Sequence, residues 1–544
     1  MPYMSVAAIN AAIDHVAATF PALARSIVLP ERSVEGGTIK ALRIAGGSGA
    51  GSLPDTRVGV LLVGGIHARE LVNPETLVEF ALRLCTARAG NTGLAFGPKT
   101  YTATDVQLAV DGLSIVILPM ANPDGRNHCL VAGGFPMWRK NRALNPGLAC
   151  RGVDLNRNTS FLWGSGIGTS TDSCSDVFRG PSAFSEPETR NVRWLIDSFP
   201  GLASMVDVHS YSELVLFPWG DDENQTTNPS QNFQNPAFDG QRGTLGNNYK
   251  EFIPAGDLSS HQAMGNRIRN GIAAVRGRSY TVQQSINLYP TTGTWHDYAY
   301  ARRFVETGRR TILGFTLETA REFQPGDAEK AQVVSETQAG LMEALFQTLC
   351  PAEAVQSLSA AQASGQMFAL QAMREFRDQR MLASAKGQRI EQAYRRHAGE
   401  VVALLSGNRE ALAAARTALS VASELAGSQK ARAQPMSGKQ AGDLGQVFEL
   451  LSKLGSPALR ADIAKSLAAM GKFDGAVLDR IFTLPKKTRP KPMPATKKVR
   501  VARKPAAAKK KVAAARKAPP RKKAATAKKR SAAKPARKSG RRKG

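Results

Sequence analysis

The first 350 residues alternate short apolar runs with amphipathic segments. Four of the runs are bounded by polar residues or glycine, as buried strands are. They lie at 58–65, 113–120, 203–209 and 311–317. Between them, residues 74–85 and 186–199 space their apolar side chains like one face of a helix. This alternation predicts an α/β fold with a mixed central β-sheet flanked by helices.

The pattern changes twice along the chain. A polar segment at 221–248 is rich in Asn, Gln and Gly, and long loops in compact domains are often functional. After one more amphipathic helix at 328–349, strand patterns disappear and Ala, Leu, Arg and Glu recur with helical spacing. We therefore expect a first domain at 1–351 and a helical region at 352–485.

The charge of the chain is concentrated at its end. Lys and Arg number 73 against 44 Asp and Glu, and the net charge is +29. Residues 486–544 hold 26 of the basic residues and none of the acidic ones, so the rest is nearly neutral. This Lys/Arg/Ala/Pro segment has too little apolar content for a core and is predicted to be disordered. In composition it is similar to linker-histone tails, which favours non-specific nucleic-acid binding. A solubilising extension, or binding to anionic polymers or membrane surfaces, are the alternatives.

Residues 1–21 lack a basic start and a sustained apolar run, so they predict a surface helix and not a secretory signal. Nowhere is the chain apolar over the roughly 20 residues that a membrane-spanning helix needs. These features favour a cytoplasmic location, which for a chain with a basic tail includes association with the nucleoid.

Two histidines and a glutamate are placed as zinc ligands would be. His67 and Glu70 lie three residues apart in a turn after the strand at 58–65, so both side chains can reach one ion. His209, at the end of the strand at 203–209, is the candidate third ligand, although a lone buried histidine is more often a core residue. Two histidines and one glutamate leave a fourth position for water, as catalytic zinc requires.

These residues belong to a longer, ordered series of motifs. The series is HARE (67–70), NPDG (122–125), WRK (138–140), GVDLNRN (152–158), VHSYS (208–212), LYPTTGT (288–294) and FTLET (315–319). With these motifs in this order, residues 1–350 resemble the zinc carboxypeptidase family that includes the pancreatic carboxypeptidases and their bacterial relatives. The resemblance implies a hydrolase with one zinc per chain that removes the C-terminal residue of peptides or proteins.

The resemblance also implies roles in the chemistry. His67, Glu70 and His209 would bind zinc, which lowers the pKa of a bound water to about 7. Asp154 would orient the zinc-binding ring of His67, as carboxylates commonly do for such histidines.

Glu318, just past the strand at 311–317, would be the general base, and Arg139 would stabilise the oxyanion. A carboxylate within reach of the attacking water can take its proton and pass it to the leaving amine. A fixed cation where negative charge develops typically contributes about 10²–10³ in rate.

The substrate's terminal carboxylate would be held by Asn156 and Arg157, and Tyr289 would close over it. The guanidinium of arginine suits bidentate binding of a carboxylate better than an ammonium does. Further substrate contacts are implied for Arg69, Ser210 and Tyr211.

His296 takes the position at which relatives that prefer basic C-terminal residues carry an acid. A preference for Lys or Arg is therefore disfavoured, and we expect a neutral, apolar or mixed preference.

Cys150 and Cys174 flank GVDLNRN, and the resemblance implies a disulfide between them, as in some secreted relatives, with two free buried thiols as the alternative. A disulfide indicates an oxidising compartment, so secretion is the alternative to a cytoplasmic location.

Two other functions fit the sequence. The same zinc chemistry could act on peptidoglycan stem peptides or glutamyl side chains, because these also end in a carboxylate. The chain could instead be a nucleic-acid-associated protein whose peptidase domain is secondary or silent. The complete set of ligand, base and carboxylate-binding residues argues against a silent domain.

Overall fold

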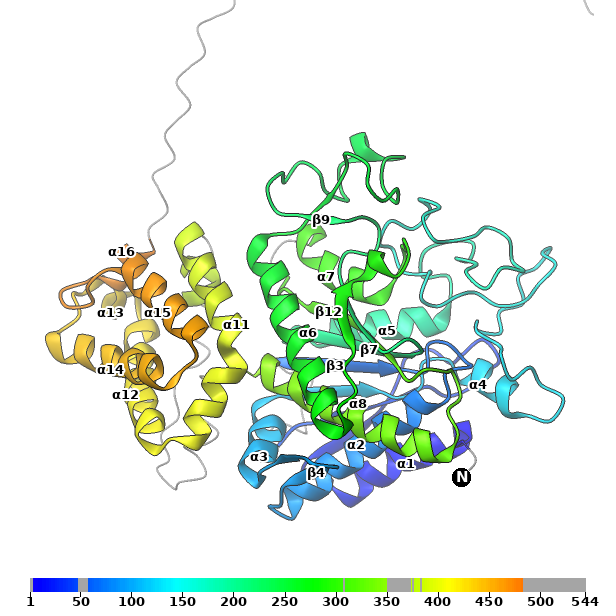
Figure 1. Ribbon diagram of the computed structural model, residues 1–544, viewed down its shortest axis with the longest axis horizontal. Helices are drawn as coiled ribbons and strands as arrows, with labels where there is room; N and C mark the ends of the chain where they lie inside the picture. The colour runs from blue at the N-terminus through cyan, green and yellow to red at the C-terminus, as the bar shows by residue number, and fades with distance from the viewer. Residues whose placement is uncertain are drawn as a thin grey trace, which may run out of the picture. The chain divides into compact units, whose positions relative to one another are not determined.

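The fold is described from a computed structural model (Figure 1). The described residues are 3–46, 57–306, 309–349, 373, 376–381 and 384–482. By its internal contacts the chain divides into Met1–Pro485 and Lys486–Gly544. The basic tail and the expected boundary at 351 lie outside the described residues. The three-part division and the disorder of the tail therefore stay predictions.

An eight-stranded mixed sheet lies at the centre of residues 1–349. Its order is β1 (Ala24–Val28), β2 (Lys40–Ile44), β6 (Ser114–Leu118), β3 (Gly59–Gly64), β7 (Leu202–Ser210), β12 (Leu313–Thr319), β8 (Leu214–Phe217) and β11 (Thr281–Gln284). The four central strands β6, β3, β7 and β12 run parallel. Strands β1 and β2 pair antiparallel, as do β2 with β6 and β12 with β8. The predicted α/β class with a mixed sheet is confirmed.

Helices cover both faces of this sheet, as the burial of its central strands requires (Figure 1). Every residue of β3, β6 and β7 is buried. Val60 and Leu62 belong to one core, and Leu61 and Val63 to the other, because successive side chains of a strand point to opposite faces.

The two cores are built with different helices. The first contains residues of α1 (Val6–Thr19), α2 (Val72–Ala89), α3 (Ala103–Gly112), α6 (Ala255–Arg276) and α8 (Asp327–Thr348). The second contains residues of α5 (Pro187–Ser198) and α7 (Trp295–Val305). The remaining elements of this part are α4 (Pro123–Leu130), β4 (Leu94–Phe96), β5 (Lys99–Tyr101), β9 (Asn224–Gln225), β10 (Glu251–Phe252), η2 (Pro236–Phe238) and η3 (Ser285–Asn287).

The 22-residue helix α6 was not anticipated, because its glycines weaken the helical pattern. The packing explains those glycines. A Cβ at Gly271 would lie 2.9 Å from the carbonyl oxygen of Ala339 in α8, and one at Gly340 would lie 2.9 Å from Ile272. Glycine on each helix therefore allows α6 and α8 to approach closely, an effect of tertiary contact that the local sequence pattern does not reveal.

One predicted strand is displaced in a way that matters for the site. The run at 311–317 is observed as Leu313–Thr319, so the expectation that Glu318 lies just past the strand is wrong. Glu318 lies inside β12 and pairs in register with His209 of β7. The strand extends further because its last residues continue the parallel ladder with β7 up to Thr319 and Ser210.

The described residues beyond 372 are predominantly helical. They form η4 (Arg377–Met381), α11 (Ala385–Gly407), α12 (Arg409–Gly427), α13 (Gln429–Ala433), α14 (Gly438–Leu454), α15 (Pro457–Met470) and α16 (Leu478–Ile481). Ser384, Asn408, Ser437 and Ser456 accept hydrogen bonds at helix N-termini, the usual role of these residue types. The helices surround an apolar cavity of about 480 Å³. Among the helices that the structure describes, none has the length and hydropathy to cross a membrane.

Candidate metal centre and active site

The two histidines and the glutamate of the HARE and VHSYS motifs meet at the carboxyl ends of β3 and β7. His67 and Glu70 lie in the turn between β3 and α2, and His209 is the penultimate residue of β7. Because β3 and β7 are adjacent and parallel, with Gly64 opposite Val208, these positions converge at one edge of the sheet. All three side chains are buried.

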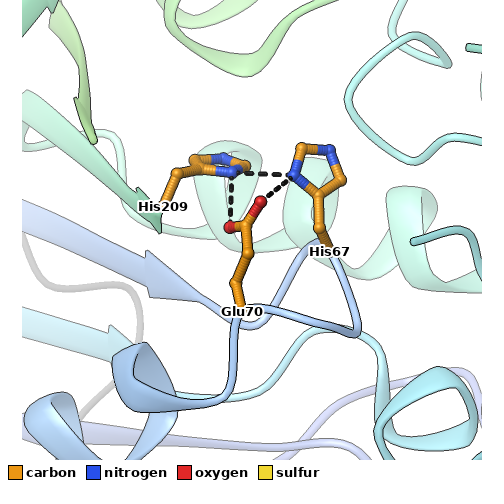
Figure 2. A group of neighbouring side chains, drawn as sticks. All are labelled: His67, Glu70 and His209. Atoms are coloured by element: carbon orange, nitrogen blue, oxygen red, sulfur yellow. Dashed lines mark hydrogen bonds and ion pairs between the residues drawn. The ribbon is translucent and has the colours of Figure 1, made fainter. Parts of the chain in front are cut away.

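Figure 2 shows the carboxylate of Glu70 between the two imidazole rings. Glu70 Oε1 lies 2.7 Å from His67 Nδ1, and Oε2 lies 3.0 Å from His209 Nδ1. The two Nδ1 atoms are themselves 3.0 Å apart. Among the described residues, this is the one group of His, Cys, Asp and Glu whose ligand atoms converge closely enough to hold a metal ion.

The outer nitrogens of both rings contact buried carboxylates. His67 Nε2 lies 3.2 Å from Asp154 Oδ1, and His209 Nε2 lies 2.7 Å from Asp207 Oδ2. When the rings are neutral, as metal binding requires, donation from each Nε2–H leaves the lone pair of each Nδ1 facing inward, together with the Glu70 oxygens. Two imidazole nitrogens and one carboxylate are a donor set that fits Zn²⁺.

Asp207 was missed from the sequence, although a signal for it exists. It precedes His209 by two residues on one strand, and side chains at that spacing point to the same face. An acidic residue two positions before a metal-ligating histidine on a strand is therefore a candidate partner for the outer nitrogen of that histidine ring.

Charge around the three residues favours a cation. Burial opposes ionisation of Glu70, but His67 and His209 outweigh it and lower the pKa of this carboxyl below its usual range. Burial likewise opposes ionisation of Asp154, but Arg139 and His67 hold its pKa well below the ordinary value. Both acids are therefore ionised around the two imidazoles.

Glu318 faces the same edge from the neighbouring strand. It is the one residue of β12 that is not fully buried, and its register partner is His209. Burial raises the pKa of Glu318 to about 8, and the charge of His209 opposes that shift. A carboxyl group whose pKa lies near neutrality can both take up and release a proton.

Arg139 is joined to the three residues through Asp154. Its Nε and Nη2 atoms donate to Asp154 Oδ2 at 3.1 and 2.8 Å. Its Nη1 atom lies 3.4 Å from His67 Nδ1. The guanidinium is therefore fixed beside the candidate metal ligands and carries a permanent positive charge there.

A cavity of about 500 Å³ opens next to Arg139. It is lined by Arg69, Arg139, Arg157, Gly168, Thr169, Asp176, Val177, Tyr289 and Pro290. Three guanidinium groups against a single carboxylate give this cavity a net positive charge. Such a lining suits an anionic group of a ligand.

Arg157 is held rigidly in the lining. Its Nε atom donates to Gly168 O at 2.9 Å and its Nη1 atom donates to Asn156 O at 2.7 Å. Asn156 is fixed in turn, because its Oδ1 accepts a hydrogen bond from the Trp295 backbone. Tyr289 is half-exposed, and its ring lies 6.0 Å from the Arg157 guanidinium.

A disulfide joins Cys150 and Cys174. It closes the segment that carries Asp154, Asn156 and Arg157, together with the loop that supplies Gly168.

Arg69 lies at another part of the lining. Its Nη1 atom donates to Asp176 Oδ2 at 3.2 Å, and its guanidinium lies 4.3 Å from the centre of the Phe323 ring. The exposed ring of Tyr211 meets the same Phe323 edge to face, at 4.8 Å. Ser210 donates its backbone N–H to Glu70 Oε2. Asp176 and Phe323 were not anticipated, because each reaches Arg69 from a distant part of the sequence.

His296 is buried at the start of α7 and lies outside this lining. Its Nδ1 atom is 2.9 Å from Thr316 Oγ1 of β12. Burial, together with the nearby His209 and Arg157, lowers the pKa of His296 to about 3. The ring is therefore neutral at physiological pH.

Comparison with known proteins finds relatives that are named carboxypeptidases. The model of the family described as zinc carboxypeptidase matches residues 9–340. Carboxypeptidase B of Helicoverpa zea is 32% identical over 231 residues, which are 42% of this chain and 48% of that protein. Carboxypeptidase B of Astacus astacus is 34% identical over 214 residues, which are 39% of this chain and 62% of that protein. The chain thus spans about half the length of the curated relatives it matches.

A solved structure of carboxypeptidase A from Helicoverpa armigera has a TM-score of 0.45 and 25% identity, and the match covers 66% of this chain and 75% of that one. The family match covers more than half of the chain and includes every motif described above. The chain belongs to the zinc carboxypeptidase family.

Proposed function

We propose that this chain is a zinc metallocarboxypeptidase that removes the C-terminal residue of peptides or proteins. The observation that carries the proposal is the linkage of the candidate metal centre and the cavity lining through one buried carboxylate. Asp154 contacts His67 of the candidate metal centre and also Arg139, which lines the cavity that contains Arg157. A hydrolytic centre and a binding place for a terminal carboxylate are thus parts of one site.

Arg157 and Asn156 bind the free carboxylate of the substrate in this proposal. Arg157 is buried and fixed through two of its nitrogens, so little side-chain entropy is lost when it binds an anion. Tyr289 is exposed enough to move and close over the bound carboxylate. Arg69, Ser210 and Tyr211 contact residues further upstream.

The chemistry follows from the groups around the scissile bond. His67, Glu70 and His209 would hold a zinc ion, which would lower the pKa of a bound water. Glu318 accepts the proton of the attacking water and delivers it to the leaving amine. Arg139 donates hydrogen bonds to the oxyanion as its negative charge develops.

The C-terminal residue that is removed is neutral in this proposal. His296 is uncharged, and burial together with Asp221 raises the pKa of the adjacent Asp297 well above its ordinary value. Neither group then offers the negative charge that a terminal Lys or Arg would need. The same zinc chemistry on peptidoglycan stem peptides or glutamyl side chains is the alternative.

We further propose that residues 486–544 bind nucleic acid without sequence preference, on the strength of 26 basic and no acidic residues. The Cys150–Cys174 disulfide supports an oxidising compartment over a reducing one for the catalytic part.

The wild-type protein is expected to contain one zinc per chain, and His209→Ala to lose most of it. Asp207→Asn should keep zinc with an affinity lowered by roughly 10- to 100-fold, because the ring of His209 is then less firmly oriented. His15→Ala, on the exposed side of α1, is the matched control. Elemental analysis and chelator titration measure both effects. Stoichiometric zinc in His209→Ala would exclude these ligands.

Amidation of a peptide's C-terminus is expected to lower kcat/KM by about a hundredfold or more, because a charge-assisted bidentate contact with Arg157 is lost. Pairs of peptides that differ only in the amide test this, and Glu318→Gln serves as the blank because its amide cannot accept the water's proton. Equal rates on both members of a pair would indicate an endopeptidase and remove Arg157 from its role.

Peptides ending in Leu or Gln are expected to be better substrates than peptides ending in Lys. The ratio of kcat/KM for a Leu or Gln peptide to kcat/KM for a Lys peptide should stay constant from pH 5 to 8. The pKa of His296 lies near 3, so the ring gains no proton in that range. His296→Asp should shift the ratio at least about tenfold towards Lys by pairing the ammonium with a carboxylate, and His296→Asn should not. Faster cleavage of Lys by the wild type contradicts this.

Truncation after Pro485 is expected to abolish DNA and RNA binding while leaving kcat/KM on a small neutral peptide unchanged. With six to ten phosphate contacts, affinity of the full chain should fall about 10³–10⁵-fold between 50 and 200 mM salt, because counterions are released on binding. Fluorescence anisotropy measures the binding. Undiminished binding by the truncated chain would place the nucleic-acid contact elsewhere.

A further inference from the structure

The cavity among the helices beyond residue 372, here called the bundle cavity, has no counterpart in the residues that the family model matches, 9–340. Its volume is about 480 Å³, and its walls come from η4, α11, α12, α14, α15 and α16. Packed protein interiors hold few voids larger than a water molecule. The bundle cavity instead has the size of sites that bind small molecules, about 300–1,000 Å³.

The inner face of α12 leaves this space open because it carries alanines. Ala415, Ala418, Ala422 and Ala426 follow one another at three or four residues, and all four line the bundle cavity. In a closely packed bundle such positions hold Leu, Ile or Val, whose side chains fill the space between helices. Four alanines in one row keep that space free of side chains.

Flexible side chains form another part of the wall. Met373, Met381, Met436 and Met470 line the bundle cavity, and they are four of only 13 methionines in the chain. Methionine adapts its shape to what it contacts and is common at surfaces that bind varied apolar partners. Branched and aromatic residues with well-defined rotamers would pack a permanent core more firmly. The wall is therefore suited to close around an apolar ligand.

The charged residues of the lining limit what the ligand can be. Asp462 lies 3.2 Å from His397 Nε2 and also pairs with Arg396, so its charge is compensated within the wall. The other two ionisable residues of the lining that carry a formal charge, Arg377 and Glu391, are opposite in sign. An ionised ligand would compete with these groups for their partners, whereas an uncharged ligand leaves them undisturbed.

We propose that the bundle cavity binds one uncharged, predominantly apolar small molecule. Tyr394 of α11 lines the cavity and exposes 42% of its surface, so it marks where the cavity meets the solvent. Helices border the space from several directions, and a helix of a partner protein would have to displace one of them. A small molecule can enter beside Tyr394 without doing so, and burial of its apolar surface drives binding.

The test uses the full chain and 1-N-phenylnaphthylamine, an uncharged dye whose fluorescence rises in apolar surroundings. We expect saturable binding of one dye per chain, with a Kd of roughly 10 µM for a ligand of this size. Dodecanol should displace the dye at least about tenfold better than dodecanoate does, because the carboxylate must lose its hydration on entry. Equal competition by dodecanoate would contradict an uncharged ligand.

The double substitution Ala418→Phe with Ala422→Phe should weaken dye binding at least about tenfold and leave the temperature of unfolding unchanged or higher. The two rings occupy open space and do not overpack a filled core. Ala413→Phe, on the exposed face of the same helix, is the matched control and should bind dye like the wild type. If the double variant loses its helical circular dichroism, Ala418→Leu replaces it, with at least about a threefold loss of affinity expected.

Two results would overturn the inference. The first is a wild type that binds no dye, which means that the space is taken by the chain itself, with residues 350–372, outside the described residues, as the first candidate. The second is a folded filled variant that binds dye as tightly as Ala413→Phe does, which places the dye elsewhere on the protein.

Discussion

The buried carboxylate of Asp154 fixes two functional groups at once, and the geometry of the site depends on it. One oxygen contacts His67 Nε2, and the other accepts two hydrogen bonds from Arg139. Because Asp154 is inaccessible to solvent, loss of either partner would leave a buried charge poorly compensated, which is strongly destabilising. The pairing therefore fixes the position of the positively charged Arg139 guanidinium relative to the candidate metal ligands.

The sheet provides the frame in which this pairing can form. Strands β3, β7 and β12 are adjacent and parallel, so their carboxyl ends present His67, Glu70, His209 and Glu318 at one edge. The interior positions of β3 and β7 are buried between two cores of different side chains, so a slip by one residue would move each side chain into the wrong core. A slip would turn His209 and Asp207 to the opposite face, away from Glu70.

One loop holds two separate parts of the cavity. The segment anchored by the Cys150–Cys174 disulfide supplies Gly168 O to Arg157, and Asp176, just after the disulfide, pairs with Arg69. Two arginines of the cavity lining, Arg69 and Arg157, are thus positioned by the same loop.

The sequence by itself determined the α/β class, which depends on local periodicity, and it indicated His67, Glu70 and His209 as candidate metal ligands. The resemblance to the zinc carboxypeptidases implied Asp154, Asn156 and Arg157, which stand together in GVDLNRN.

Only the tertiary structure decided which distant residues meet. The pairing of Arg69 with Asp176 joins positions 107 residues apart, and Glu318 is placed beside His209 by the ladder between β12 and β7. Such contacts depend on packing over the whole chain, which a pattern of hydrophobic and polar positions does not encode residue by residue.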